Sequence, residues 1–186
     1  METKVGRTWL EIVSGDIARL DVDAIVAATT VDRPMETAPA GAVKRAGDRA
    51  VEDSGGAHGP TAIGDAVPAT QSGPKARWVI LAAVTGHDLT SNATCIAAAT
   101  TRSLEVVETL GARSVAFPAL GAEAGGFPLY ACADIILANV RDYLVEHPRS
   151  RIRRVVFCAS DAADRAAFGH AMAGLWRSEG RTNKHS

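Results

Sequence analysis

The sequence predicts a single α/β domain of three layers, α/β/α, with a mixed and largely parallel central sheet. Short apolar segments of the buried-strand type alternate with longer segments of helical periodicity. The later strand segments are apolar on both faces, which is typical of parallel strands covered by helices on both sides. A chain of 186 residues fits one domain. We expect residues 1–178 to form it and residues 179–186 to be a disordered tail.

Two predicted strands and a helix open the chain. Residues 9–17 (WLEIVSGDI) alternate and then break at a glycine, and residues 22–30 (VDAIVAATT) form a short apolar run. Alanine, valine and charged residues at helical spacing predict a helix over 40–51. Turn residues dominate 54–65 (SGGAHGPTAIGD), so a loop follows that helix.

The middle of the chain adds two strands and a long helix. A weak strand is predicted at 65–70 and a strong one at 78–84 (WVILAAV), with a turn over 71–75 between them. A helical pattern follows from 91 to 110, and Gly111 is placed to end it.

The last third of the chain repeats this alternation. We predict a strand over 112–120, a helix over 128–147 that begins with a proline, a strand over 151–160 and a helix over 162–176. Ser160 or Asp161 is placed to cap the final helix.

Composition excludes several classes of protein. The chain is 47% hydrophobic with a formal net charge of -1, so no global basic field attracts nucleic acid, and we expect no such partner. The apolar runs are far shorter than the roughly 20 residues that a membrane span needs, so we expect no membrane contact. The N-terminal residues lack the pattern of a signal peptide, which predicts a cytoplasmic protein.

Neither a metal nor a cofactor is expected. The three cysteines lack the spacing of metal ligands and lie in apolar segments, so we expect small buried thiols. Four histidines share no ligand spacing with cysteine or carboxylate. These residues are Cys95, Cys132 and Cys158, and His58, His147, His170 and His185.

Two loops at predicted strand ends could bind a ligand, because open α/β sheets bind ligands beyond the carboxyl ends of their strands. In the first, Asp16 offers an acceptor that could bind an adenine amino group or cap a helix. The second, residues 121–127, is called the glycine loop below. Its small residues let backbone amides approach an anion, and Pro128 begins a helix whose dipole favours one. A tight turn that needs glycine is the alternative.

The order of these segments resembles the macrodomain family, in the bacterial branch that binds or processes ADP-ribose. The resemblance covers roughly residues 9–175. It is carried by GDI (15–17), VDAIV (22–26), AGAVKRAG (40–47), WVI (78–80), FPALG (117–121) and GGFP (125–128). It implies a macrodomain fold with an ADP-ribose cleft, in which Asp16 meets the adenine and the glycine loop wraps the phosphates. The implied ligand-binding residues are Asp16, Ile17, Ala28, Thr30, Gly121, Ala122, Glu123, Ala124, Gly125, Gly126 and Phe127.

Four departures from the family pattern all fall on the cleft. Residues 27–30 read Ala-Ala-Thr-Thr where hydrolytic members carry Asn-Ala-Ala-Asn, and residues 36–39 (ETAP) replace a triple glycine and a small apolar residue. Glu123 occupies a position where the family commonly has glycine, and Leu81 occupies one where it commonly has histidine. Alanine cannot hydrogen-bond a ribose hydroxyl, and Pro39 removes an amide donor. We therefore predict that the hydrolytic geometry is absent, and we assign no catalytic residue.

Glu123 admits two interpretations. A carboxylate aimed at a diphosphate would oppose it by about 4 kcal/mol per charge pair at about 4 Å and an effective dielectric near 20. The side chain could instead point to solvent and leave the amides of the glycine loop free. Alternatively, it could occupy the anion pocket itself, bound by the amides of Gly125 and Gly126.

Two other polar groups have simpler explanations. His87 and Asp88 have no nucleophile placed beside them, and Asp88 is predicted to cap the helix that begins near Ser91. The basic cluster in PRSRIRRVVF precedes a strand and is predicted to be a solvated edge. It consists of Arg149, Arg151, Arg153 and Arg154.

Three functions remain open, in this order of preference. The first is a module that binds ADP-ribose or a related nucleotide, including ADP-ribose on a modified protein, with little or no hydrolysis. The second is a degenerate macrodomain that acts only in protein interaction. The third is an ADP-ribosyl hydrolase or O-acetyl-ADP-ribose deacetylase in which Glu36 or Glu123 replaces the usual catalytic group.

Overall fold

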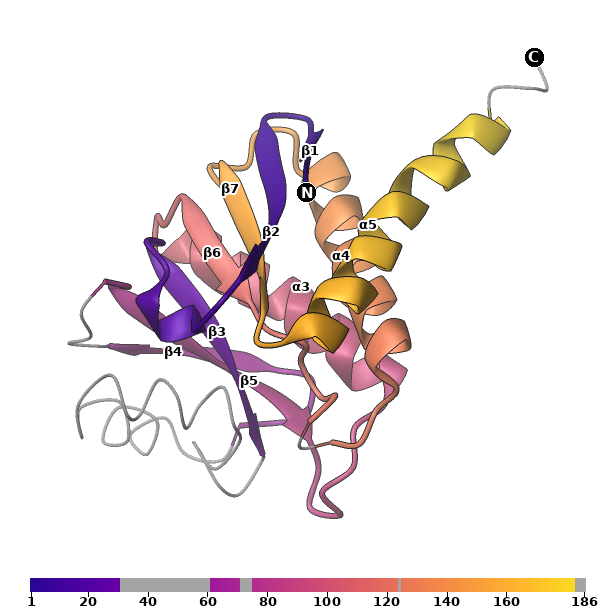
Figure 1. Cartoon of the computed structure of the whole chain (residues 1–186). Coiled ribbons are helices and arrows are strands. Elements are labelled where there is room, and N and C mark those ends of the chain that lie inside the picture. The colour runs from indigo at the N-terminus through magenta and orange to yellow at the C-terminus, as the bar shows by residue number, and fades with distance from the viewer. Residues whose placement is uncertain (31–60, 71–74, 124, 183–186) are drawn as a thin grey trace.

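The computed structural model describes residues 1–30, 61–70, 75–123 and 125–182, which form one α/β domain (Figure 1). Seven strands, three α-helices and one short 3-10 helix are formed by these residues. In chain order they are β1 (Glu2–Val5), β2 (Thr8–Ser14), η1 (Ile17–Arg19), β3 (Ala24–Thr30), β4 (Ala66–Thr70), β5 (Trp78–Thr85), α3 (Ala93–Thr109), β6 (Ser114–Phe117), α4 (Leu129–Glu146), β7 (Arg154–Ala159) and α5 (Ala162–Thr182).

The seven strands form one mixed sheet in the order β1-β2-β7-β6-β3-β5-β4. The five inner strands run parallel to their neighbours, whereas β1 and β4 pair antiparallel at the two edges. The predicted α/β fold with a largely parallel sheet is therefore confirmed. Because the inner strands are parallel, β2, β7, β6, β3 and β5 all end at the same edge, here called the strand-end edge.

Each face of the sheet carries its own hydrophobic core. Figure 1 shows α3, α4 and α5 against one face, where alternate strand residues such as Val26, Ile80 and Phe157 join the larger core. The intervening residues, including Ile25 and Val79, form a smaller core with residues of η1 and the segment after it. Burial on both faces explains why β3, β5, β6 and β7 read as continuous apolar runs, whereas β2 alternates between buried and more exposed residues.

Asp23 joins three strands at the opposite edge. Its carboxylate accepts hydrogen bonds from the amides of Arg113 (2.7 Å) and Ser114 (2.9 Å), just before and at the start of β6. Its carbonyl accepts from the amides of Arg77 and Trp78 at the start of β5, both at 3.0 Å. Partial burial alone would raise the pKa of Asp23. The hydrogen bonds of Asp23 with Arg113 and Ser114 outweigh this effect and hold the pKa below its ordinary value.

Most predicted elements are confirmed, with informative differences at their ends. The edge strand β1 was missed, since its residues show no apolar periodicity. The predicted first strand stops at Ser14, and Asp16 opens η1 instead. Helix α5 continues to Thr182, within the segment 179–186 that we expected to be a tail. The helix predicted over 40–51, most of the loop over 54–65 and most of the turn over 71–75 lie outside the described residues.

The prediction that Asp88 caps the long helix is wrong. Asn92 caps α3, because its side chain accepts the amide of Cys95 at 2.9 Å. Asp88 instead accepts hydrogen bonds from the hydroxyl (2.7 Å) and amide (3.1 Å) of Thr90, which form a local turn and lower the pKa of Asp88. The helix begins at Ala93, so its N-terminus lies too far along the chain for Asp88 to cap it.

The expectations for helix ends and thiols are otherwise met. Gly111 follows the end of α3 with a φ of +68°, a left-handed conformation that favours glycine. All three cysteines are free and buried. Among the residues that the structure describes, no helix is long and apolar enough to cross a membrane.

Candidate functional site

Three loops from neighbouring strands meet at the strand-end edge. They follow β2 (Gly15 and Asp16), β7 (Ser160 and Asp161) and β6 (the glycine loop), and β7 lies between β2 and β6 in the sheet. The two loops chosen from the sequence are therefore separated by only one strand. This arrangement matches the general position of ligands in open α/β sheets.

Asp16 combines a structural role with an exposed carboxylate. One oxygen accepts the amide of Ala18 at 3.0 Å and so caps η1, while the other lies 3.8 Å from Nε of Arg19. The capping alternative raised by the sequence is thus observed. Because the side chain is 40% exposed, an acceptor remains available to a ligand as well. Ile17 beside it is 5% exposed and packs into the smaller core.

A thiol fixes the loop after β2 to the end of β7. The amide of Gly15 donates to the carbonyl of Ala159 at 2.9 Å, and Sγ of Cys158 donates to the carbonyl of Gly15 at 3.3 Å. Burial, with smaller contributions from Asp16 and Asp164, raises the pKa of the Cys158 thiol to about 12. This cysteine is therefore a neutral hydrogen-bond donor rather than a nucleophile.

The turn from β7 into α5 places two carboxylates at the same edge. Asp161 accepts the amide of Asp164 at 2.9 Å, and Asp164 accepts the amide (2.9 Å) and hydroxyl (2.6 Å) of Ser160. Asp161 is thus the predicted cap, while Asp164 was not anticipated. A signal was available, since two acidic residues three apart at a helix start can bind the first amides reciprocally.

The glycine loop is held by its own backbone and by the connection after β5. The amide of Phe127 donates to the carbonyl of Gly121 at 3.1 Å, and the amide of Ser91 donates to the carbonyl of Gly125 at 3.0 Å. Gly121 and Gly126 have φ values of +84° and +61°. Helix α4 begins directly after the loop, with Pro128 as its N-cap residue. The loop therefore lies at the positive end of an 18-residue helix.

The residues of the glycine loop differ in exposure. Gly121 and Gly125 are buried, Ala122 and Phe127 are half-buried, and Glu123 and Gly126 are exposed. Ala124 lies outside the described residues. A ligand approaching the loop would therefore meet Gly126 and Glu123 first.

Glu123 faces an acidic neighbourhood. Partial burial, followed by the carboxylates of Asp164 and Asp161, raises its pKa above the ordinary value. Within the described residues, no hydrogen bond joins Glu123 to the amides of Gly125 or Gly126. This observation favours the solvent-facing interpretation over a plugged anion pocket.

The departures on β3 and β5 are neighbours in the sheet. Ala27 pairs with Leu81 in the parallel register, and both are closed to solvent in the smaller core, at 0% and 2% exposure. Ala28 is buried in the larger core on the other face, and Thr30 is half-buried at the end of β3. Of these four residues, Thr30 alone combines a polar side chain with partial exposure.

Thr85 is a buried polar group at this edge that sequence reasoning missed. It ends β5 opposite Thr30, where the pairing of β3 with β5 shifts register. Its hydroxyl is buried and has no hydrogen-bond partner within the described residues. The sequence contains no pattern that singles out Thr85, since threonine is common in strands.

The remaining candidates behave as structural groups. Arg154 pairs with Glu11 and donates to the carbonyl of Asp21, and Arg153 donates to the carbonyl of Ser150. Arg149, Arg151 and Arg153 are exposed, as predicted, whereas Arg154 is half-buried and the strand that follows, β7, is an inner strand rather than an edge. Among the described residues, no group of histidine, cysteine and carboxylate side chains could hold a metal ion.

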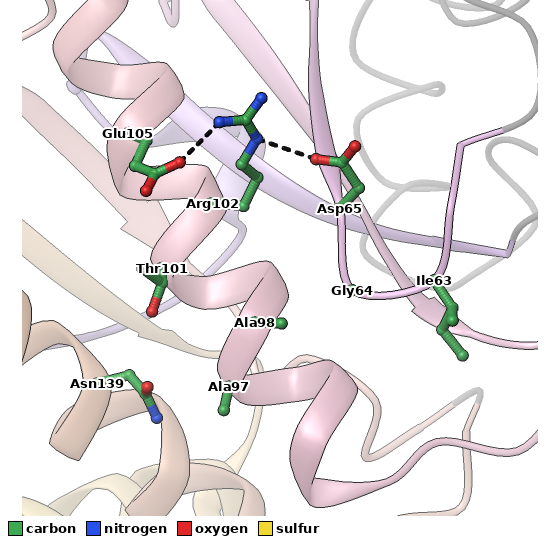
Figure 2. A pocket seen from close by; sticks show the side chains of 9 residues that line it. All are labelled: Ile63, Gly64, Asp65, Ala97, Ala98, Thr101, Arg102, Glu105 and Asn139. Carbon is green, nitrogen blue, oxygen red and sulfur yellow. Dashed lines mark hydrogen bonds and ion pairs between the residues drawn. The ribbon is translucent and has the colours of Figure 1, made fainter.

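A separate pocket of about 520 Å³ lies between α3, the segment before β4 and Asn139 of α4. Figure 2 shows the Arg102 guanidinium pointing between Asp65 (3.0 Å) and Glu105 (2.7 Å). The rest of the lining consists of Ile63, Gly64, Ala97, Ala98 and Thr101. None of the implied ligand residues contributes to this pocket. The Arg102–Asp65 ion pair connects the residue before β4 to α3, and the Arg102–Glu105 pair lies within α3.

The fold and the three strand-end loops define an α/β protein of the macrodomain class. The Macro domain family model matches residues 27–136, which is more than half of the chain. A second line of support comes from an O-acetyl-ADP-ribose deacetylase of Cronobacter turicensis. It is 32% identical over 154 residues, which cover 76% of this chain and 84% of the relative. The chain belongs to the macrodomain family.

Longer relatives also share this domain. An uncharacterised protein of Mycobacterium tuberculosis is 34% identical over 166 residues, which cover 89% of this chain. The same match spans only 45% of that relative. The chain thus spans about half the length of this relative.

Solved structures support the fold at low sequence identity. A macrodomain of Oceanobacillus iheyensis with ADP has a TM-score of 0.82 at 18% identity and covers 96% of this chain and 97% of its own. A Trypanosoma brucei macrodomain in complex with ADP-ribose has a TM-score of 0.80 at 19% identity, over 88% and 68% of the two chains.

Proposed function

We propose that this macrodomain binds ADP-ribose or a related adenine nucleotide at the strand-end edge, with little or no hydrolysis. The observation that carries the proposal is that Asp16 and the glycine loop lie at the same edge, on strands separated only by β7. Asp16 offers an exposed acceptor for an amino group. The helix start after the glycine loop favours a diphosphate.

The relatives support this choice of ligand. The Oceanobacillus and Trypanosoma macrodomains contain ADP and ADP-ribose, and their chains share this fold. An ADP-ribosylated protein is the partner that such a module would recognise. The cytoplasm is the compartment we propose, on the composition.

Acidic residues limit the affinity. The carboxylates of Glu123, Asp161 and Asp164 share the edge where a diphosphate would lie, and each pair of like charges opposes binding. Solvent around the exposed Glu123 side chain screens its contribution. We expect binding that is weaker than in a variant without the Glu123 charge.

Little hydrolysis is proposed because the apolar pair Ala27 and Leu81 replaces polar residues of hydrolytic members. Neither side chain can orient a ribose hydroxyl or a water molecule. Both are closed to solvent in the smaller core.

A second candidate function is O-acetyl-ADP-ribose deacetylation or ADP-ribosyl hydrolysis, which the Cronobacter relative favours. It would need a substitute base. Glu123 is a carboxylate with a raised pKa, and a carboxylate near a positioned water can act as a general base. Glu36 lies outside the described residues. A nucleotide-free interaction module is the third candidate.

Isothermal titration of the purified protein with ADP-ribose, beside Glu123→Gly, tests the proposal. Binding by the native protein supports it. Recovery of binding only in Glu123→Gly would show that the carboxylate blocks an otherwise competent site. If neither the native protein nor Glu123→Gly binds ADP-ribose, the proposal is overturned in favour of the interaction module. Release of acetate or ADP-ribose, lost in Glu123→Gln, would establish the enzyme instead.

A further inference from the structure

Ser91 lies where the end of β5, the start of α3 and the glycine loop meet. Its Oγ donates to the carbonyl of Val84 at 2.6 Å, and its amide donates to the carbonyl of Gly125 at 3.0 Å. The thiol of Cys95 donates to the same Val84 carbonyl at 3.2 Å. Ser91 therefore connects the end of β5 to the loop after β6.

Two glycines of the loop pack directly on Ser91. An ideally placed Cβ on Gly121 would lie 2.5 Å from Oγ of Ser91, and one on Gly125 would lie less than 3.0 Å from Cβ of Ser91. Real Cβ atoms essentially never approach that closely. The absence of a side chain thus lets both positions pack against Ser91, and Gly121 also has a φ of +84°, which by itself favours glycine. By contrast, a Cβ on the exposed Gly126 would meet nothing within 4 Å.

The position of Ser91 is fixed from the helix side. Asn92 next to it caps α3, with its side chain accepting the amide of Cys95 at 2.9 Å and its own amide donating to Sγ of Cys95 at 3.3 Å. Helix α3 is in turn anchored by residues of the larger core, such as Ile96. The loop must therefore fit against Ser91, because Ser91 has little freedom to move.

We propose that Ser91 is a positioning residue for the ligand. Through its contacts with Gly121 and Gly125 it sets where the exposed part of the glycine loop lies at the start of α4. That position decides how well the loop amides reach a diphosphate. The inference rests on the proposed function in one respect, namely that the ligand of this loop is the diphosphate of ADP-ribose.

The first test is a size exchange measured by titration with ADP-ribose. Gly125→Ala places a methyl group against Ser91 and is expected to weaken binding about tenfold, the equivalent of losing one or two hydrogen bonds. Ser91→Gly removes the opposing Cβ. The double variant is expected to recover part of the loss, but not all, since the new methyl group would still lie 2.8 Å from the carbonyl of Gly121.

Additive losses in the double variant would overturn the inference, because they would show that the two positions act independently. Thr94→Ala is the matched control. Thr94 is exposed in the first turn of α3, and its replacement is expected to leave the affinity unchanged.

The second test needs no ligand. Amide hydrogen exchange of residues 119–123 and 125–127 is expected to be faster in Gly125→Ala and to return toward the native rate in the double variant. If the native protein binds no ADP-ribose while this exchange pattern holds, the proposed function fails and the support of the loop by Ser91 stands. Unchanged exchange in both Gly125→Ala and Ser91→Gly would overturn the inference, whatever the native protein binds.

Discussion

Ala27 and Leu81 lie opposite each other in the parallel pairing of β3 with β5, and both are closed to solvent. These two departures from the family pattern are 54 positions apart in the chain but are direct neighbours in the sheet. If only one of these two residues were polar, its side chain would be buried without a hydrogen-bond partner. This pairing ties the loss of polar groups to the packing of the smaller core.

The pairing predicts the effect of restoring one polar residue. Ala27→Asn should lower the free energy of unfolding by about 2 kcal/mol, since it buries an amide without a partner and overfills the core. Urea unfolding measures the change. Ala122→Asn, at a half-buried position of the glycine loop, provides a comparison. An equally stable Ala27→Asn variant would mean that this part of the core is looser than its burial indicates.

Asp16→Ala should affect both binding and stability. Loss of the cap on η1 is expected to cost about 1 kcal/mol of stability. Loss of the acceptor should weaken ADP-ribose binding about tenfold, which titration would detect. Asp21→Ala removes an exposed carboxylate close in sequence and serves as the control. Equal affinities for Asp16→Ala and the native protein would remove Asp16 from the binding site.

Binding should depend on pH through Glu123. Its raised pKa means that protonation begins at a higher pH than for an ordinary glutamate, and the neutral form no longer repels a diphosphate. The affinity for ADP-ribose should therefore rise as pH falls from neutral toward the raised pKa of Glu123. Glu123→Gln should bind more tightly at pH 7 and show a flatter profile. Parallel pH profiles for the two proteins would indicate that another group controls the dependence.

The same shift has a consequence for stability. A carboxyl group whose pKa is raised on folding favours the folded state below its unfolded pKa, and that contribution is lost as pH rises through the folded pKa. Glu123→Gln should thus be slightly more stable than the native protein at neutral pH and equal to it in acid. Thermal unfolding at pH 7 and pH 4 compares the two.

Asp23 should have the opposite dependence. Its pKa is lowered on folding, so its contribution is present above the unfolded pKa and is lost as pH falls through the folded pKa. Asp23→Asn should cost about 1–2 kcal/mol at pH 7, after allowance for solvent screening, and much less near pH 3. Urea unfolding at both pH values checks this. Affinity for ADP-ribose should stay unchanged, because Asp23 lies at the opposite edge of the sheet.

Residue patterns along the chain were enough to predict the architecture and the two loops of interest. Continuous apolar runs at Ala24–Thr30 and Trp78–Thr85 predict buried parallel strands, because each residue can be apolar only if both faces are covered. Helix ends were also readable where the local chemistry is sufficient, as at Gly111 and Asp161. Asp88 shows the limit, since its own turn with Thr90 competes with capping.

Which residues contact one another could not be predicted and became clear from the folded structure. The sequence offers no reason to pair Ala27 with Leu81, or to set Gly125 against Ser91, because such contacts depend on strand order and on how the loops pack. The acidic surroundings of Glu123 likewise arise from β6 and β7 being neighbours in the sheet. Burial and charge at a site are sums over residues that are distant in the chain, and folding alone brings those residues together.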